Sequence, residues 1–262
     1  MKQLLIIISF FVCNSVAACS CNITSLIEKV QNSAFIAKIK ILKISESKND
    51  PDYKYAEIEV LELFKGNHIK NIKFSSELRN FCSLSVSENT TWLVFANKGK
   101  SEVMEFGYCS GSTELDRKYD KYESEKYPNA ENNKRRSDEL KISVLRYFKS
   151  RNITNPNVYR LEIDVVEEDL IKKGLRGYEV SNQRFAVYEF KVEKNLIISK
   201  IKTLKAFDNQ KLSDSLFFIL KDAKIEPKKG LSTLNKRNQF ILVFYYYPAE
   251  EIYKSFISKY DL

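Results

Sequence analysis

The chain has 262 residues, of which 44% are apolar and 29% charged, and a formal net charge of +9. That length and apolar content allow one large or two ordinary domains with buried cores. The positive charge is scattered, and lysines often alternate with apolar residues, as over 38–41, which is typical of a half-buried strand. Without clustered charge beside stacking aromatic residues, the composition argues against nucleic-acid binding and favours attraction to acidic envelope polymers or anionic lipid surfaces.

The first 18 residues have the pattern of a secretory signal peptide. Lys2 supplies the positive start, residues 4–12 form an apolar run, and residues 15–18 form a small-residue cleavage region. We expect cleavage after Ala17 or Ala18, the alternative being lipidation of Cys19, which would anchor the protein to a membrane. The apolar run is too short to span a bilayer, and no later stretch approaches the roughly 20 residues required. The sequence therefore predicts an exported protein, periplasmic or extracellular, with no transmembrane segment.

Cysteine usage agrees with export. Of 5 cysteines, Cys13 leaves with the signal, and an even number remains for an oxidising compartment, which predicts a disulfide framework. A Cys19–Cys21 bond would close a very tight loop, because disulfides need a specific separation of their α-carbons. Two arrangements remain open, Cys19–Cys82 with Cys21–Cys109 or the swapped pairing.

Residues 19 to about 115 are predicted to be mostly strand. A short helix is expected over 25–32, and alternating apolar and charged residues predict strands over 34–44 and 55–63. Further short strands are expected over 69–74, 91–96 and 103–106. Short strands with few helices favour a small barrel or sandwich.

Several motifs follow one another in this part of the chain. They are Cys-x-Cys at 19–21, a strand over 34–39, a strand ending at 60–66, a cysteine before the strand 92–96, and Tyr-Cys-Ser-Gly-Ser at 108–112. This ordered set resembles the netrin-like module of tissue inhibitors of metalloproteinases, the TIMPs, which bacterial secreted proteins also carry.

The netrin-like resemblance covers residues 19–115 and implies an OB-fold barrel. In that family the first cysteine pairs with the third and the second with the fourth, which implies Cys19–Cys82 and Cys21–Cys109. The family's leading cysteine chelates the zinc of the protease, which would make Cys19 the chelating residue. Ser20 then stands where the family places a residue that points into the specificity pocket of the protease.

Residues 117–136 carry mixed charge with little aliphatic content, which predicts a charged linker or exposed loop between the barrel domain, 19–116, and the rest. Ser137 is a candidate N-cap, since Asp138 and Glu139 follow it and apolar residues then fall on one helical face. A helix is predicted from there to about residue 152.

Residues 137–262 are predicted to form a second, small α+β domain. Strands are expected over 159–166, 184–192 and 197–204, a helix from near Ser213 or slightly before, and an aromatic strand over 240–247. Residues 188–195 before a strand, the amphipathic helix and a proline shortly before the last strand resemble the C-terminal domain of TonB-family proteins, over about 180–248. Because the chain shows no anchor or Pro-rich spacer, the resemblance implies a periplasmic interaction domain and not an energy transducer.

The sequence offers few candidate catalytic, metal-binding or redox residues. The lone histidine, His68, is expected in a loop without partners for a catalytic triad or a histidine-rich metal site. Acidic residues at Glu57, Glu59 and 167–169 have the pattern of solvated faces. Cys19 and Cys21 offer a redox pair as an alternative, because a thiolate of low pKa attacks disulfides.

These patterns predict a non-enzymatic exported protein that binds another protein at the cell envelope or outside the cell. We expect no cofactor, no intrinsic metal and no nucleic-acid partner. The alternatives are inhibition of a zinc metalloendopeptidase through Cys19 and thiol–disulfide exchange.

Overall fold

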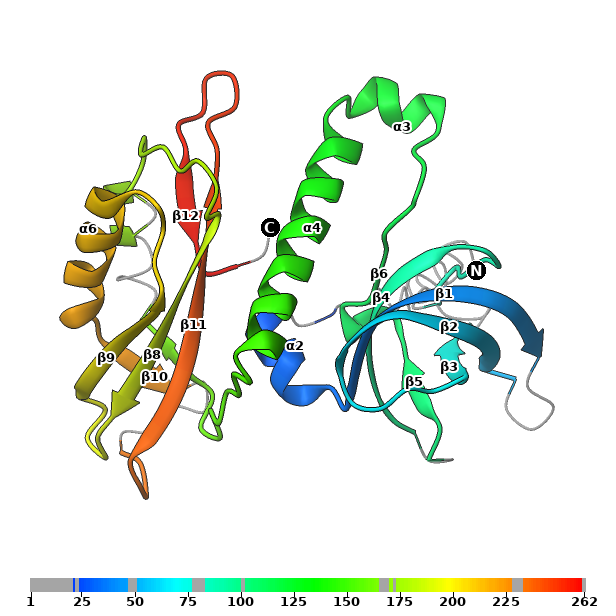
Figure 1. Cartoon of the computed structure of the whole chain (residues 1–262), viewed down its shortest axis with the longest axis horizontal. Helices are drawn as coiled ribbons and strands as arrows, with labels where there is room; N and C mark the ends of the chain where they lie inside the picture. Colours follow the sequence, from blue (N-terminus) through cyan, green and yellow to red (C-terminus); the bar gives the residue numbers. More distant parts are fainter. Residues whose placement is uncertain are drawn as a thin grey trace, which may run out of the picture.

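The structure is a computed structural model, and it describes residues 21, 24–46, 51–76, 83–99, 102–164, 170–171, 173–227 and 233–260. A barrel built from the first half of the chain lies on one side, and a sheet from the second half lies on the other (Figure 1). The long helix α4 (Ala130–Ser150) runs between them, and α6 (Gln210–Lys221) covers the far face of the sheet (Figure 1).

The N-terminal part forms a closed five-stranded barrel of OB-like topology. Its strands follow the order β1-β2-β3-β5-β4, and β4 pairs with β1 to close it. The pair β3 and β5 is parallel, while the other pairs are antiparallel. The strands are β1 (Phe35–Glu46), β2 (Tyr53–Lys65), β3 (Asn71–Ser75), β4 (Thr91–Lys98) and β5 (Met104–Phe106), with β6 (Thr113–Glu114) beside β4. The predicted barrel is confirmed at this level.

Strand β4 is buried on both faces. Trp92 and Val94 point into the barrel core, whereas Leu93 and Phe95 belong to a second apolar cluster outside it. Burial on both sides explains why residues 92–96 form a continuous apolar run instead of alternating with polar residues. Strand β1 shares this property at Ile36, which packs outward beside Leu93 and Phe95.

The C-terminal part contains a four-stranded antiparallel sheet in the order β12-β11-β8-β9. Helix α6 packs on one face through Leu212, Leu216 and Leu220, which are fully buried at helical spacing. The strands are β8 (Phe185–Val192), β9 (Ile198–Lys205), β11 (Asn238–Tyr247) and β12 (Phe256–Ser258), and a separate pair joins β7 (Leu161–Ile163) to β10 (Ile225–Pro227).

The helices between the two sheets differ in part from expectation. Helix α2 (Leu26–Asn32) begins as predicted, with Ser25 and Glu28 forming a capping box. Helix α4, however, follows Asn129, whose side chain makes no capping hydrogen bond, so it begins well before the predicted cap Ser137. Helix α3 (Lys121–Lys126) also forms within the segment predicted as a charged linker.

Several charges of that segment are paired, which supports its folding. In the first turns of α4, Lys134 Nζ lies 2.5 Å from Asp138 Oδ2 and also donates to the backbone carbonyl of Glu114. Arg136 forms an ion pair of 3.0 Å with Glu250 in the loop before β12. Helix-supporting pairs at four-residue spacing are visible in the sequence, but these contacts with distant residues are not.

Helix α4 buries apolar side chains against both halves of the molecule. Leu140, Val144, Leu145 and Phe148 belong to one cluster with residues from the barrel strands, from α2 and from the sheet face opposite α6. The sheet contributes Phe185, Val187, Ile241, Val243 and Tyr245 to it. The barrel and the sheet thus share an apolar core, from which we predict that they unfold together and not as the two separate domains expected from the sequence.

A bidentate ion pair joins α4 to the barrel wall. Arg146 donates from Nε and Nη2 to the two carboxylate oxygens of Glu62 on β2, at 2.8 and 2.7 Å. The hydrogen bond from Arg146 lowers the pKa of Glu62, partial burial opposes this, and the charges of Arg146, Lys149 and Lys38 lower the pKa further. Lys149 adds a hydrogen bond of 2.6 Å to the carbonyl of Leu63.

We predict that Glu62→Gln lowers the free energy of unfolding at neutral pH by about 0.2–1 kcal/mol, since the arginine is exposed. The folded pKa lies below that of the unfolded chain, so the ion pair stabilises the protein above the unfolded pKa of about 4.3. This stabilisation is lost as pH falls through the folded pKa. Urea titrations should therefore show a gap between wild type and variant that closes in strong acid.

Glu59→Gln is the control, because Glu59 is an exposed residue of the same strand with no ion pair among the described residues. A gap for Glu62→Gln that persists in acid would contradict this interpretation of the pair.

Candidate functional site

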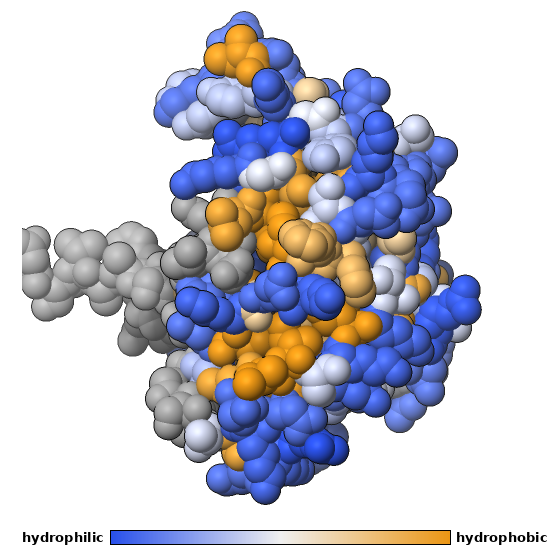
Figure 2. Space-filling view, turned by 90° about the vertical axis from the view of Figure 1, so that its left-hand side faces the viewer, coloured by the Kyte–Doolittle hydropathy of each residue, from blue (hydrophilic) through white to orange (hydrophobic). Residues whose placement is uncertain are grey.

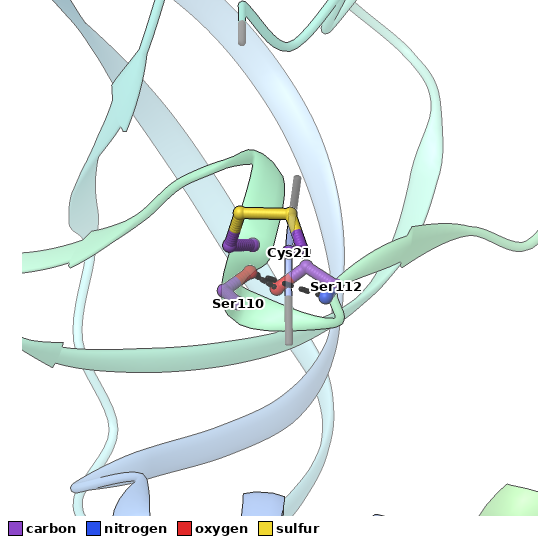
Figure 3. The surroundings of a disulfide bond; sticks show 4 residues. Cys21, Ser110 and Ser112 are labelled. Atoms are coloured by element: carbon purple, nitrogen blue, oxygen red, sulfur yellow. Dashed lines mark hydrogen bonds between the residues drawn. A yellow bond between two sulfur atoms is a disulfide. The ribbon is translucent and has the colours of Figure 1, made fainter. Parts of the chain in front are cut away.

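The start of the described chain is tied to the barrel by a disulfide. Cys21 is bonded to Cys109, with α-carbons 5.3 Å apart and a sequence separation of 88 (Figure 3). Cys109 lies in the short 3-10 helix η1 (Tyr108–Ser110), between β5 and β6. The bond is the one that the netrin-like resemblance implies, and it fixes the segment before α2 to the wall of the barrel. The other members of the predicted site, Cys19, Ser20 and Cys82, lie outside the described residues.

Two serines beside Cys109 anchor the turn that carries it (Figure 3). Ser112 Oγ accepts a hydrogen bond of 2.9 Å from the backbone N–H of Phe95 on β4 and lies 2.8 Å from Ser110 Oγ. Between them, Gly111 has a φ of +80°, and an added Cβ would meet the side chain of Lys29 on α2. The sequence marked residues 108–112 as a family-like motif, and the structure gives them a local role as a turn fixed to β4.

Helix α2 carries the tethered segment back onto the barrel. Lys65 of β2 donates to the carbonyls of Val30 and Gln31 at the end of α2, at 2.7 and 3.4 Å. A cation at this position satisfies carbonyls that have no partner within the helix. Burial lowers the pKa of Lys65. The segment after Cys21 is therefore held at both ends, by the disulfide and by this lysine.

The structure places the candidate chemical residues on the surface. His68, Glu57 and Glu59 are all exposed, and residues 167–169 lie outside the described part of the chain. Within the described residues, no group of three or more His, Cys, Asp or Glu side chains is arranged to hold a metal ion. No helix among these residues is long and apolar enough to cross a membrane.

Apolar side chains are exposed on α6 and next to it. Phe218 is 71% exposed and Phe217 38% exposed, while Ile197 in the turn between β8 and β9 is 60% exposed. Figure 2 looks onto this side of the molecule and shows hydrophobic surface gathered between hydrophilic areas. We call Phe217, Phe218 and Ile197 the α6 surface.

A shallow groove of about 720 Å³ continues the α6 surface. Lys221 and Asp222 line it from the end of α6, one helical turn beyond Phe217 and Phe218 and so on the same side of the helix. Its apolar wall combines the β8–β9 turn and the start of β9 with β10 and the chain before it, namely Leu196, Ile197, Ile198, Ala223, Ile225 and Pro227.

The sequence contained a signal for this surface that pattern analysis missed. Leu212, Leu216 and Leu220 already fill the buried stripe of α6, and each successive residue turns by about 100° around a helix. Two adjacent phenylalanines cannot then both join that stripe, so at least one must face solvent. The helix itself was predicted, but not its exposed aromatic residues.

No family model matches the chain, and no curated protein is similar enough to match it.

We predict that non-reducing peptide mapping of the mature protein recovers Cys21 linked to Cys109. Replacing Cys109 by serine should cost about 2–5 kcal/mol of stability, because the bond closes a long loop of the unfolded chain. If the expected Cys19–Cys82 bond forms as well, thiol titration finds no free thiol in the native protein. Recovery of Cys19 linked to Cys109 would contradict the pairing, and a reactive thiol would favour thiol–disulfide exchange.

Proposed function

We propose that the protein is a non-enzymatic, exported binding protein that acts through protein–protein contact at the cell envelope or outside the cell. The observation that carries this proposal is the α6 surface. Contiguous exposed apolar surface with a polar rim is typical of interaction sites, and aromatic side chains contribute most to their binding energy. The disulfide suits an oxidising compartment, which supports export.

The arrangement of elements supports different roles for two modules. The closed OB-like barrel with the Cys21–Cys109 bond is compatible with a netrin-like module over 19–116. The hairpin β8–β9, the helix α6 and the strand β11 are compatible with a TonB C-terminal-like core over about 180–248. We propose that the second module contributes the docking surface and that the first module holds the N-terminal segment.

We predict that Phe218→Gln abolishes capture of the partner. Loss of an aromatic anchor typically costs about 2 kcal/mol or more, which is roughly thirtyfold in affinity. Because Phe218 is mostly exposed, the variant should keep the stability of wild type within about 0.5 kcal/mol. The measurement is quantitative co-purification of proteins from a native envelope extract with the immobilised mature protein.

Ile252→Gln is the matched control, since Ile252 is 86% exposed in the loop between β11 and β12, outside α6. The proposal requires a protein that wild type and Ile252→Gln retain and Phe218→Gln loses. Equal retention by all three proteins would refute a docking role for α6.

Inhibition of a zinc metalloendopeptidase is the second candidate, and the Cys21–Cys109 bond favours it because it braces the residue that follows Ser20. In this scheme the free amine and carbonyl of Cys19 would ligate the protease zinc. A chain that begins at Cys19 is compared with the same chain carrying one extra N-terminal alanine, on a panel of zinc endopeptidases. Only the chain that begins at Cys19 should inhibit, and equal effects of the two chains would exclude chelation.

A further inference from the structure

A cavity of about 300 Å³ lies between the first half of α4 and the hairpin formed by β11 and β12. Its walls are largely apolar, with Leu140 on α4, Tyr247 and Pro248 after β11, and Tyr253 and Phe256 on the other arm. The rings of Tyr247 and Phe256 stack with centroids 4.9 Å apart. The cavity is at the small end of ligand pockets and has room for about one aromatic or branched aliphatic group.

The charges that line this cavity are mainly positive. Arg136, Arg184 and Lys254 face a single carboxylate, Glu250, which is already paired with Arg136 at 3.0 Å. Neither Arg184 nor Lys254 forms an ion pair with any described residue. Positive charge is thus in excess at this site.

Arg184 carries an unexplained feature. Its Nε is buried and has no hydrogen-bond acceptor within the described structure. A second hollow of about 180 Å³ is also lined by Arg184, Arg136 and Leu140, so the arginine borders both hollows. A buried donor without an acceptor costs free energy. Nε has almost no accessible surface, so a ligand in the cavity meets Arg184 at its terminal Nη groups.

We propose that this cavity binds a carboxylate attached to an apolar group, with the carboxylate on Arg184 and the apolar group against Leu140, Tyr247 and Phe256. A guanidinium presents parallel N–H donors that match the two oxygens of a carboxylate. The apolar walls would pack against the apolar group of the ligand. The carboxylate belongs either to a small free acid or to the end of a peptide chain.

The probes are N-acetyl-phenylalanine, its amide, and a pentapeptide that ends in phenylalanine with a free carboxylate. Binding to the full mature protein is followed by NMR chemical-shift titration. We expect saturable binding of at least one carboxylate probe. The amide should bind at least about tenfold more weakly than the acid, because it lacks the charge that pairs with Arg184. Binding of the pentapeptide alone identifies a chain end as the source, and binding of the acetylated amino acid identifies a small acid.

Arg184→Gln should weaken binding of the carboxylate probe about tenfold and leave the melting temperature no lower than that of wild type, because Nε has no acceptor to lose. Arg135→Gln is the matched control, since Arg135 is an exposed arginine of α4 that bonds Asn132. Should Arg184→Gln prove unstable, Tyr253→Ser tests the apolar wall at a residue that is 71% exposed.

No saturable binding of any carboxylate probe at millimolar concentration overturns the proposal. Equal affinity for acid and amide, or equal loss in Arg184→Gln and Arg135→Gln, also overturns it. The site is separate from the α6 surface, so either outcome leaves the proposed protein-binding function untouched.

Discussion

Burial of helix α4 from two sides is the constraint on which the rest of the structure depends. Its apolar face packs against the outer side of barrel strands β1 and β4 and against the sheet face opposite α6. Polar contacts fix the same arrangement. Tyr147 donates a hydrogen bond of 2.7 Å to the carbonyl of Leu204 on β9. Asn155 accepts a hydrogen bond of 3.0 Å from the N–H of Ile241 on β11 and donates one of 3.4 Å to Gln31 of α2.

This arrangement decides which surfaces remain available. The C-terminal sheet has α4 on one face and α6 on the other, so the outer side of α6 is directed away from the barrel (Figure 1). The disulfide-anchored start of the chain belongs to the barrel instead. The Arg184 cavity forms where α4 passes the hairpin of β11 and β12. Each candidate surface thus follows from how α4 divides the molecule.

Local patterns predicted most of the elements but not their mutual contacts. Alternation located β1 and β2 within a few residues, and a turn between two strand-forming runs located β8 and β9. Ser25 marked the start of α2 because its cap is formed by a neighbour in sequence. The start of α4 was missed because its charged first turns are stabilised by Glu114 and Glu250, which lie far away in the chain. The short strands β6 and β12 have too few residues to show a period.

The sequence likewise predicts some features of the candidate sites and not others. The partner of Cys21 came from the ordered motifs, since residues alone left two pairings open. Exposure of Phe218 could have been deduced from the filled stripe of α6. The Arg184 cavity could not, because it needs residues from α4, from the residue before β8 and from both arms of a hairpin. Such a site depends on tertiary packing, which no short sequence window contains.

The most direct test of the shared core uses the only tryptophan, Trp92, which reports on the barrel. Leu216→Ala on α6, a fully buried position far from the barrel core, should cost about 2–5 kcal/mol. If α4 couples the two parts into one cooperative unit, the urea midpoint of Trp92 fluorescence falls together with that of far-UV circular dichroism. A Trp92 transition that stays at its wild-type midpoint in this variant would show that the barrel unfolds on its own and would contradict the account.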